Sequence, residues 1–244
     1  MRPEQVTVVV PTYNERENLP HLAAAVLLHG HRLIVVDDNS PDGTGVMADE
    51  LAAETLGMEV IHRSSKQGLG SAYGEGFRRA LDGGAEVVVQ MDCDFSHNPT
   101  DIPRLVAAVE TGGADLGLGS RYVPGGATPD WPWHRRFLSK GGNIYARTML
   151  GIPVRDATGG FRAWTAPGLQ SLPFGKAEAS GYGFQVEMAM RAVDQGLKVV
   201  EVPIVFRDRT RGTSKMGSEI VLEAMRLVTV WGIRRRTAWL RFRT

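Results

Sequence analysis

The stretch EVVVQMDCDFSHNP, residues 86–99, joins an apolar run to two closely spaced acids. The run from Val87 to Met91 is short, continuous and rich in β-branched residues, which predicts a strand buried on both faces. It breaks into Asp92-Cys93-Asp94. Side chains two residues apart in an extended segment point to the same side, so both carboxylates can face one cation. Without a cation between them they repel each other.

The rest of the first half repeats the same alternation of strand and helix. Apolar strands are expected at residues 6–10, 33–36, 59–62, 87–91 and 116–120, with helices between them. This order predicts the α/β class, with a mostly parallel, Rossmann-like sheet flanked by helices on both faces. The second half is less regular. It predicts a loop at 122–133, helices at 134–150, 184–195 and 218–233, a short strand within 155–164 and a strand at 198–206.

Polar clusters follow three of these strands. They are Thr12-Tyr13-Asn14-Glu15, Asp37-Asp38 and the Asp92/Asp94 pair. In parallel sheets ligands bind beyond the carboxyl ends of the strands, so the clusters should meet at one edge.

Each cluster has an ordinary structural reading as well. Asp-x-Asp is a common surface pair, and its place after a buried strand is what favours Mg²⁺ or Mn²⁺. Asp37-Asp38 could accept from a ribose or a base, or Asn39 or Ser40 could cap the next helix. Tyr13 could stack on a base, or its segment could be a turn with a cap.

The composition limits the class of protein. The 244 residues carry a net charge of +1, with 43% hydrophobic and 23% charged residues, which is typical of a soluble globular protein and disfavours nucleic acid as a partner. A single cysteine, Cys93, excludes a disulfide within the chain and fits a reducing, cytoplasmic compartment. The sequence reaches a strand pattern at once, without a leader peptide, and has no apolar run of the ~20 residues that span a bilayer.

Several motifs in order resemble one enzyme family. They are VVVPTYNERENL, IVVDDNSPDGT, KQGLGSAYGEGFRRA, MDCDFSHNP, GSRY, DATGGFRAW, GYGFQVEM and EVPIVFRDRTRGTSK. Together they cover nearly the whole chain. They are similar to the family-2 inverting glycosyltransferases of GT-A fold and, within these, to the polyprenol-phosphate (dolichol-phosphate) mannosyltransferases.

The resemblance implies that mannose passes from GDP-mannose to a polyprenyl monophosphate. By position, the guanosine pocket would contain Pro11, Tyr13, Glu15, Val36 and Asp38. Asp92, Cys93 and Asp94 would form the metal and donor motif, with Asp94 the direct ligand of Mg²⁺ or Mn²⁺. Arg121 would contact the donor, Arg209 and Lys215 would hold its diphosphate, and Arg135 and Ser139 would receive the acceptor phosphate.

Two positions depart from the family pattern. Cys93 stands where alanine is usual, so its side chain should point away from the metal. Ser96 stands where some members have a glutamine ligand, so water would complete the metal shell. The acceptor phosphate is already anionic, and no catalytic base is expected.

The C-terminal region, 218–244, is expected to be separate from a catalytic domain at 1–217. Its helix has a wide apolar face, and five arginines follow without an acid. These features favour a helix lying on the cytoplasmic face of a membrane, without crossing it. The alternative is a core helix with a solvated tail. Two other functions also stay open, a UDP-glucose-dependent transferase and a non-catalytic binding subunit.

Overall fold

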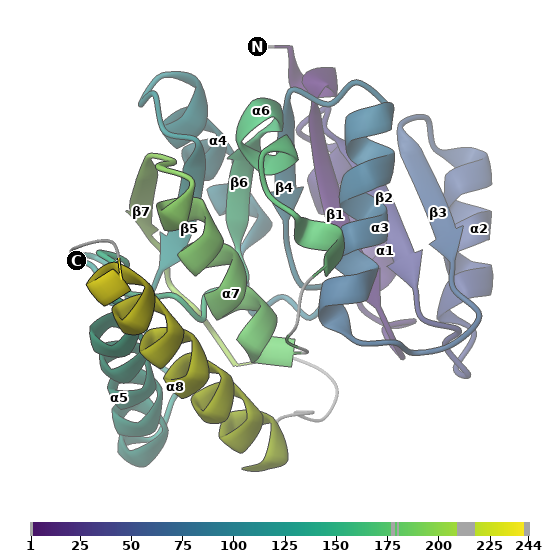
Figure 1. The fold of residues 1–244 in the computed structure, drawn as a ribbon. Helices are drawn as coiled ribbons and strands as arrows, with labels where there is room; N and C mark the ends of the chain where they lie inside the picture. Colours follow the sequence, from purple (N-terminus) through teal and green to yellow (C-terminus); the bar gives the residue numbers. More distant parts are fainter. Residues whose placement is uncertain (1, 177–178, 180, 209–217, 242–244) are drawn as a thin grey trace.

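The computed structural model describes residues 2–176, 179, 181–208 and 218–241. Within them a seven-stranded sheet has the order β3-β2-β1-β4-β6-β5-β7 (Figure 1). The strands are β1 (Val6–Thr12), β2 (Arg32–Asp37), β3 (Met58–His62), β4 (Val87–Gln90), β5 (Leu116–Ser120), β6 (Arg162–Thr165) and β7 (Val199–Pro203). The helices are α1 (Leu19–Leu27), α2 (Thr44–Glu54), α3 (Leu69–Asp82), α4 (Ile102–Glu110), α5 (Trp133–Leu150), α6 (Ala166–Gln170), α7 (Gly181–Asp194) and α8 (Ser218–Arg241).

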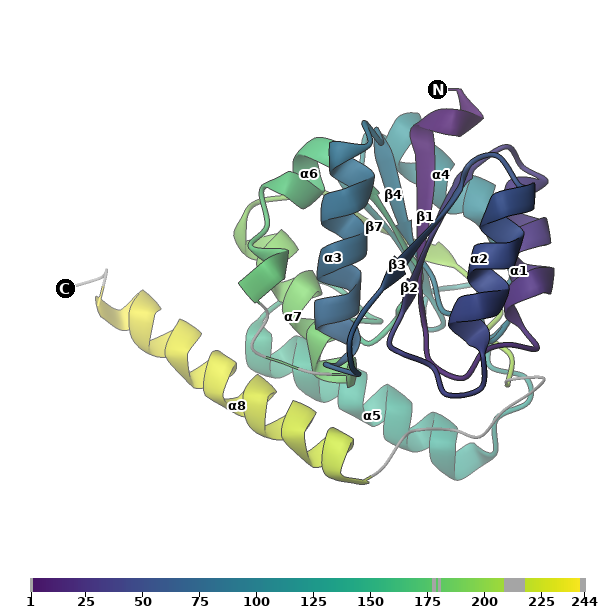
Figure 2. The same ribbon diagram turned by 90° about the vertical axis from the view of Figure 1, so that its right-hand side faces the viewer.

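Helices cover both faces of the sheet, which confirms the α/β prediction. Along β1 the side chains of Val8 and Val10 pack with α1, α2 and α4, whereas Val9 packs with α3, α6 and α7 on the other face. Figure 2 shows the two helical layers on either side of the sheet, with α5 and α8 at its lower end. Both faces bury apolar side chains, so the strands read as continuous hydrophobic runs.

The order of the strands brings the three expected polar clusters together. β1 lies between β2 and β4 and is parallel to both, with Thr12 opposite Asp37 and Val9 opposite Gln90. The carboxyl ends of all three strands therefore meet at one edge, as predicted.

The strand β6 departs from the parallel pattern. It runs antiparallel to both neighbours, β4 and β5, and pairs Arg162 with Gln90 and with Leu118. The chain leaves β5 through α5 and re-enters the sheet from the carboxyl edge. Sequence periodicity predicted a short strand in this region but carried no information on its direction.

The start of α2 differs from the sequence prediction. Neither Asn39 nor Ser40 caps α2, which starts at Thr44, where Asp42 Oδ1 accepts from the Thr44 amide at 3.0 Å. Ser40 instead donates to Asp37, through its amide at 3.0 Å and its hydroxyl at 2.6 Å.

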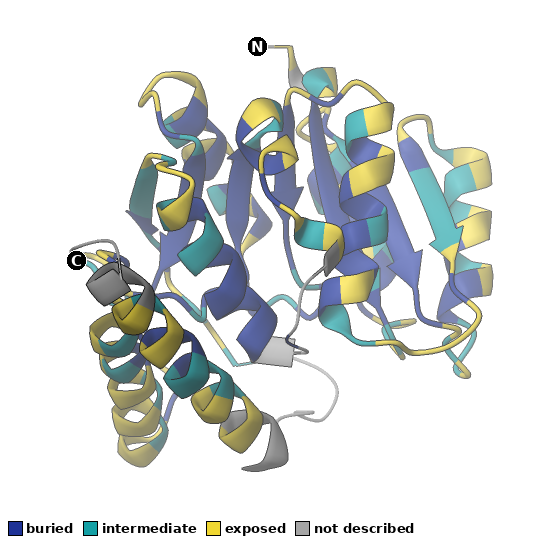
Figure 3. Ribbon diagram, viewed as in Figure 1, coloured by how far each residue is buried: buried dark blue, intermediate teal, exposed yellow. Residues whose placement is uncertain are grey.

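The C-terminal helix α8 packs against α5 and α7. Val228 and Trp231 belong to the hydrophobic core. One side of α8 is therefore packed as a core helix, which was the alternative to a membrane-contacting helix. At Gly232 a Cβ atom would lie only 2.7 Å from the Met149 carbonyl oxygen of α5, so the two helices can approach this closely because the residue is glycine. In Figure 3 the outer sides of α5 and α8 are largely exposed.

A buried ion pair holds the loop between α5 and β6. The carboxylate of Asp156 is fully buried and accepts from Arg121 Nε at 2.8 Å, from Arg121 Nη2 at 2.6 Å and from the Arg121 amide at 2.8 Å. Thr158 Oγ1 accepts from Arg121 Nη2 at 2.8 Å and from Asn143 Nδ2 of α5 at 2.9 Å. The pair thus fixes the end of β5 to the loop, and Thr158 ties this loop to α5.

We expect Asp156→Ala to lower the free energy of unfolding by about 3–5 kcal/mol, because it leaves the Arg121 guanidinium buried without a counter-charge. Urea unfolding followed by circular dichroism measures this loss. The control is Asp49→Ala, which removes an exposed carboxylate that contacts His62 at 2.9 Å and should cost less than about 1 kcal/mol. Equal losses in the two variants would contradict the role given to Asp156.

Candidate functional site

The two aspartates after β4 face the same buried surroundings. Asp94 is buried and Asp92 is partly exposed, while Cys93 between them lies in the hydrophobic core with α1 and α4. Asp92 Oδ1 accepts from the Tyr73 hydroxyl at 3.3 Å. Burial, then the negative charge of Asp92 and that of Asp94, raises the pKa of Tyr73 well above its usual value. Both carboxylates therefore act on one phenol, while the thiol points to the core.

A bend turns the chain directly after Asp94. Phe95 has a left-handed backbone with φ 60°, which is uncommon for an aromatic residue. The Ser96 amide then donates to Asp94 Oδ1 at 3.0 Å, and the Ser96 carbonyl accepts from the Arg207 amide at 3.3 Å. This turn holds Asp94 in place and leaves Ser96 buried beside it.

His97 lies behind the aspartates as a buried imidazole. Its ring stacks on Phe161 at 5.1 Å and meets the edge of Phe206 at 5.4 Å, and its Nδ1 accepts from the Asp92 amide at 3.4 Å. Burial lowers the pKa of His97, so the ring stays neutral near pH 7. Local sequence patterns do not reveal this support, because it depends on residues far apart in the chain.

The oxygen donors of the Asp92/Asp94 pair are the kind of ligand that a hard divalent ion prefers. Among the described residues no group of three His, Cys, Asp or Glu side chains is placed to hold a metal. Two carboxylates leave several coordination positions for water and for phosphate oxygens, which is the usual arrangement for Mg²⁺ at phosphate sites.

At the end of β2, the two acids have different surroundings. Asp37 accepts from Thr12 Oγ1 at 2.9 Å and from Ser40, so it supports the strand ends. Asp38 forms an ion pair with the buried Arg63, whose Nη2 also donates to Ser71 at 2.7 Å. Burial raises the pKa of Asp38, and Arg63 offsets part of this effect.

The other residues expected around the nucleoside differ in how far their side chains are exposed. Tyr13 is partly exposed, with the Lys66 ammonium 4.2 Å from its ring centroid, and Glu15 accepts from Asn18 Nδ2 at 2.8 Å. Pro11 pairs with Val36 across the strands. The Val36 side chain is fully buried in the core, so only its backbone can face a ligand.

The residues expected to bind the acceptor lie on the first turns of α5. Arg135 donates to Asp208 Oδ1 at 2.6 Å, and its guanidinium lies 4.1 Å from the Trp131 ring centroid. Ser139 follows one turn later and accepts from the Tyr122 hydroxyl at 2.6 Å. The Arg121 guanidinium is 5.4 Å from the same Trp131 ring, so one indole connects α5 to the end of β5. Arg209 and Lys215 lie outside the described residues.

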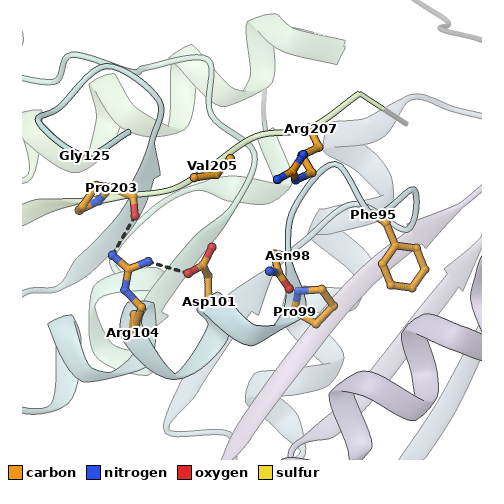
Figure 4. Close-up of a pocket in the computed structure, with 9 residues that line it drawn as sticks. All are labelled: Phe95, Asn98, Pro99, Asp101, Arg104, Gly125, Pro203, Val205 and Arg207. Atoms are coloured by element: carbon orange, nitrogen blue, oxygen red, sulfur yellow. Dashed lines mark hydrogen bonds and ion pairs between the residues drawn. The ribbon is translucent and has the colours of Figure 1, made fainter. Parts of the chain in front are cut away.

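A separate cavity of about 400 Å³ is lined by Val205 and Arg207, which follow β7 (Figure 4). Phe95, next to Asp94, also lines it. Its remaining lining residues are Asn98, Pro99, Asp101, Arg104, Gly125 and Pro203. None of the side chains expected to bind the donor or the acceptor is among its lining residues.

Comparison with known proteins gives consistent relatives. The profile of glycosyl transferase family 2 matches residues 7–167. A polyprenol monophosphomannose synthase from Mycolicibacterium smegmatis is 48% identical over 240 residues, which cover 97% of this chain and 90% of the relative. An undecaprenyl-phosphate mannosyltransferase from Micrococcus luteus is 46% identical over 241 residues, covering 98% of each chain.

Two solved structures share the fold at low sequence identity. A glucosyl-3-phosphoglycerate synthase from Mycobacterium tuberculosis, in complex with Mn²⁺, UDP and its product, has a TM-score of 0.67 at 23% identity, covering 94% of this chain and 79% of the other. A mannosyltransferase from Pyrobaculum calidifontis, in complex with GDP-Man and Mn²⁺, has a TM-score of 0.60 at 18% identity, covering 98% and 65%. These likenesses confirm the expected fold. With the family profile and the two relatives of nearly half identity, they establish that the chain belongs to glycosyl transferase family 2.

Proposed function

We propose that this glycosyltransferase moves mannose from GDP-mannose to a polyprenyl monophosphate, with inversion at the anomeric carbon. The observation that carries the proposal is a series of contacts that leads from the acid pair to α5. His97, which accepts from the Asp92 amide, meets the Phe206 ring, and Phe206 meets the Arg121 guanidinium at 5.3 Å and the Trp131 ring at 5.4 Å. Trp131 in turn contacts Arg135, one turn before Ser139. The series joins an acid pair suited to a metal–diphosphate to a cation and a hydroxyl suited to a phosphate. The similarity to synthases of polyprenol-linked mannose supports this donor and this acceptor.

The residues can be given roles in a single displacement. An oxygen of the acceptor phosphate attacks the anomeric carbon of mannose, and the bond from that carbon to the GDP oxygen breaks. Arg135 and Ser139 hold the acceptor phosphate, and Arg121 supplies a fixed positive charge near the donor. A divalent ion, Mg²⁺ or Mn²⁺, bound by Asp92 and Asp94 would neutralise the charge on the departing diphosphate.

The donor is held at its other end by the residues after β1 and β2. Pro11, Tyr13, Glu15, the backbone of Val36 and Asp38 form the proposed guanosine pocket, and Cys93 contributes its backbone beside Asp92. Arg209 and Lys215 are proposed to hold the diphosphate. The acceptor is already an anion, so positioning and charge neutralisation supply most of the rate and no catalytic base is assigned.

We also propose that the protein works as a peripheral enzyme on the cytoplasmic face of a membrane, with 218–244 as a membrane-contacting region. Among the described residues, no helix combines the length and the apolar character that crossing a bilayer requires. On α5, Trp133 and Phe137 are each 76% exposed, and Leu138 is 60% exposed. On the neighbouring α8, Leu222, Met225 and Ile233 are exposed apolar residues.

The charge of α5 agrees with an anionic lipid surface. Its sequence, WHRRFLSKGGNIYARTML, contains four Arg or Lys residues and no acid. Exposed aromatic side chains among basic ones favour the headgroup region of a membrane. Arg135 and Ser139 are less exposed than their neighbours on the same helix, so α5 can contact lipid on one side and the acceptor phosphate on the other.

The direct test of the reaction uses purified protein, a short polyprenyl phosphate and Mg²⁺ or Mn²⁺. We expect lipid-linked mannose from GDP-mannose and loss of turnover with EDTA. Lipid-linked glucose from UDP-glucose would instead support the alternative donor. No product from either donor would indicate a non-catalytic binding subunit.

The metal assignment predicts that Asp94→Ala reduces kcat by about 10³-fold or more, since the carboxylate that holds the ion is lost. Circular dichroism should show an intact fold. Asp101→Ala is the matched control, because Asp101 pairs with Arg104 in the next helical turn and should retain near-wild-type turnover. Comparable activity in Asp94→Ala and the wild type would refute the assignment.

The membrane proposal predicts that a double variant, Trp133→Glu with Phe137→Glu, loses binding to vesicles that contain anionic lipid. Co-sedimentation measures the bound fraction, which we expect to fall about tenfold or more because charged side chains replace the apolar contact. Leu56→Glu is the control, since Leu56 is 99% exposed and lies beyond α2, at the other end of the sheet. Equal binding of wild type and double variant would rule out this face of α5.

A further inference from the structure

The cavity of about 400 Å³ after β7 carries a net positive charge. The described residues that line it supply two guanidinium groups, those of Arg104 and Arg207, and one carboxylate, that of Asp101. Arg104 Nη1 donates to Asp101 Oδ1 at 2.6 Å, and Arg104 Nη2 donates to the Pro203 carbonyl at 2.9 Å. Figure 4 shows this pair at one end of the cavity and Arg207 toward the other end. The Arg104–Asp101 pair is neutral as a whole, so the surplus charge belongs to Arg207.

The side chain of Arg207 is available to a ligand. It is 66% exposed, and among the described residues the acid within ion-pair distance is Asp130, 3.8 Å from Arg207 Nη1. That separation is longer than a hydrogen bond, and an exposed pair of this kind contributes little to stability. An anionic ligand can therefore replace Asp130 at little cost.

The start of α4 adds further groups that favour an anion. Asn98 Oδ1 accepts from the Thr100 amide at 3.1 Å, which leaves the Nδ2 end of the Asn98 amide as a donor. The 3₁₀ turn Pro99–Asp101 then leads directly into α4. The amino end of a helix carries a partial positive charge, so it adds to the attraction of Arg207 for a negative group.

The remainder of the lining is largely apolar. It includes Phe95, Pro99, Pro203 and Val205. A volume of about 400 Å³ lies within the range of small-molecule sites, which are mostly apolar with a few polar groups that orient the ligand. The cavity is therefore suited to an organic molecule that carries an anionic group, rather than to an inorganic ion alone.

The cavity is connected to the acid pair through two features of the backbone. Phe95 lines the cavity, follows Asp94 directly and has the left-handed φ of 60°. The Arg207 amide donates to the Ser96 carbonyl at 3.3 Å, and the Ser96 amide donates to Asp94 Oδ1 at 3.0 Å. A ligand in the cavity thus contacts both the turn after Asp94 and the segment after β7.

Alternate residues of the segment 205–208 have different surroundings. Val205 and Arg207 line the cavity, whereas Asp208 Oδ1 accepts from Arg135 at 2.6 Å. A ligand that binds Arg207 stabilises this arrangement of the segment, in which Arg135 is paired with Asp208. The acceptor phosphate needs Arg135 without that carboxylate, so the two ligands should weaken the binding of each other.

We propose that this cavity is a regulatory site for a small organic oxyanion, a phosphate or carboxylate carried on an apolar body. Arg207 and the Asn98 amide bind the anionic group, the apolar side chains cover the body, and the Arg104–Asp101 pair contacts a polar group at the far end. The bound anion lowers the affinity for the lipid acceptor. This effect on the acceptor rests on the proposed function, whereas the site itself does not.

Calorimetry with the full chain and phenyl phosphate tests the site, with GDP and Mn²⁺ present to fill the proposed donor site. We expect Arg207→Gln to raise the Kd of phenyl phosphate about tenfold or more, because a hydrogen bond to a charged group is lost. Arg79→Gln is the matched control, since Arg79 is 53% exposed and pairs with Glu59 of β3, and the Kd should change less than about twofold. Inorganic phosphate and phenol should each bind about tenfold more weakly or worse, since each lacks one half of the ligand.

Either a soluble compound or a lipid headgroup can supply such an anion. Short-chain phosphatidic acid, used below its micelle concentration, represents the lipid. Binding tighter than that of phenyl phosphate, and weakened by Arg207→Gln, would identify a lipid as the source. Weaker binding would identify a soluble organic anion.

Steady-state kinetics test the effect on the acceptor. Phenyl phosphate should raise KM for the polyprenyl phosphate, and Arg207→Gln should need about tenfold more of it for the same rise. Equal inhibition of the wild type and Arg207→Gln would indicate direct competition at Arg135 and would overturn the regulatory effect. Equal Kd values in the wild type, Arg207→Gln and Arg79→Gln, or no binding of phenyl phosphate, would overturn the site. If the protein does not transfer mannose, the proposed function is refuted and calorimetry still decides whether the site exists.

Discussion

Two negative charges held next to each other at the end of β4 set the main constraint on this molecule. Asp94 is buried, Asp92 is partly exposed, and both act on Tyr73 and on His97. Like charges in a region of low dielectric raise the free energy unless a cation joins them. The Ser96 amide donates to Asp94, and the Tyr73 hydroxyl donates to Asp92. A divalent ion bound between the two carboxylates, as proposed above, would lower this energy further.

The surrounding cations are placed according to how tightly each is paired. Arg63 and Arg121 are buried with Asp38 and Asp156, and Arg162 is buried against carbonyl oxygens, where burial lowers its pKa to about 9. These charges are structural anchors, because breaking a buried pair is costly. They fix the strand ends and the loop before β6, which contains Gly159, so the polar groups at the sheet edge are preorganised before any ligand binds.

How far the sequence predicted this arrangement depends on the range of the interactions. The alternation of strands and helices, and the meeting of Asp38, Asp92 and Asp94 at one edge, follow from local periodicity and the rules of parallel sheets. The direction of β6 and the start of α2 do not, because tertiary packing decides them. The contact between Asn143 and Thr158 forms only when α5 and the loop before β6 are folded together.

Two arginines that contact the same tryptophan, Trp131, have different roles. Its indole contacts the guanidinium groups of both Arg121 and Arg135. Arg121 is bound to the fully buried Asp156, whereas Arg135 pairs with Asp208 at a position where the two side chains are 31% and 43% exposed. A partly exposed pair is worth little and is easily exchanged for a phosphate, but a buried pair is not. In the proposed reaction Arg121 would therefore act as a permanent charge beside the donor, and Arg135 would be the arginine of the two that releases its carboxylate and takes the acceptor phosphate.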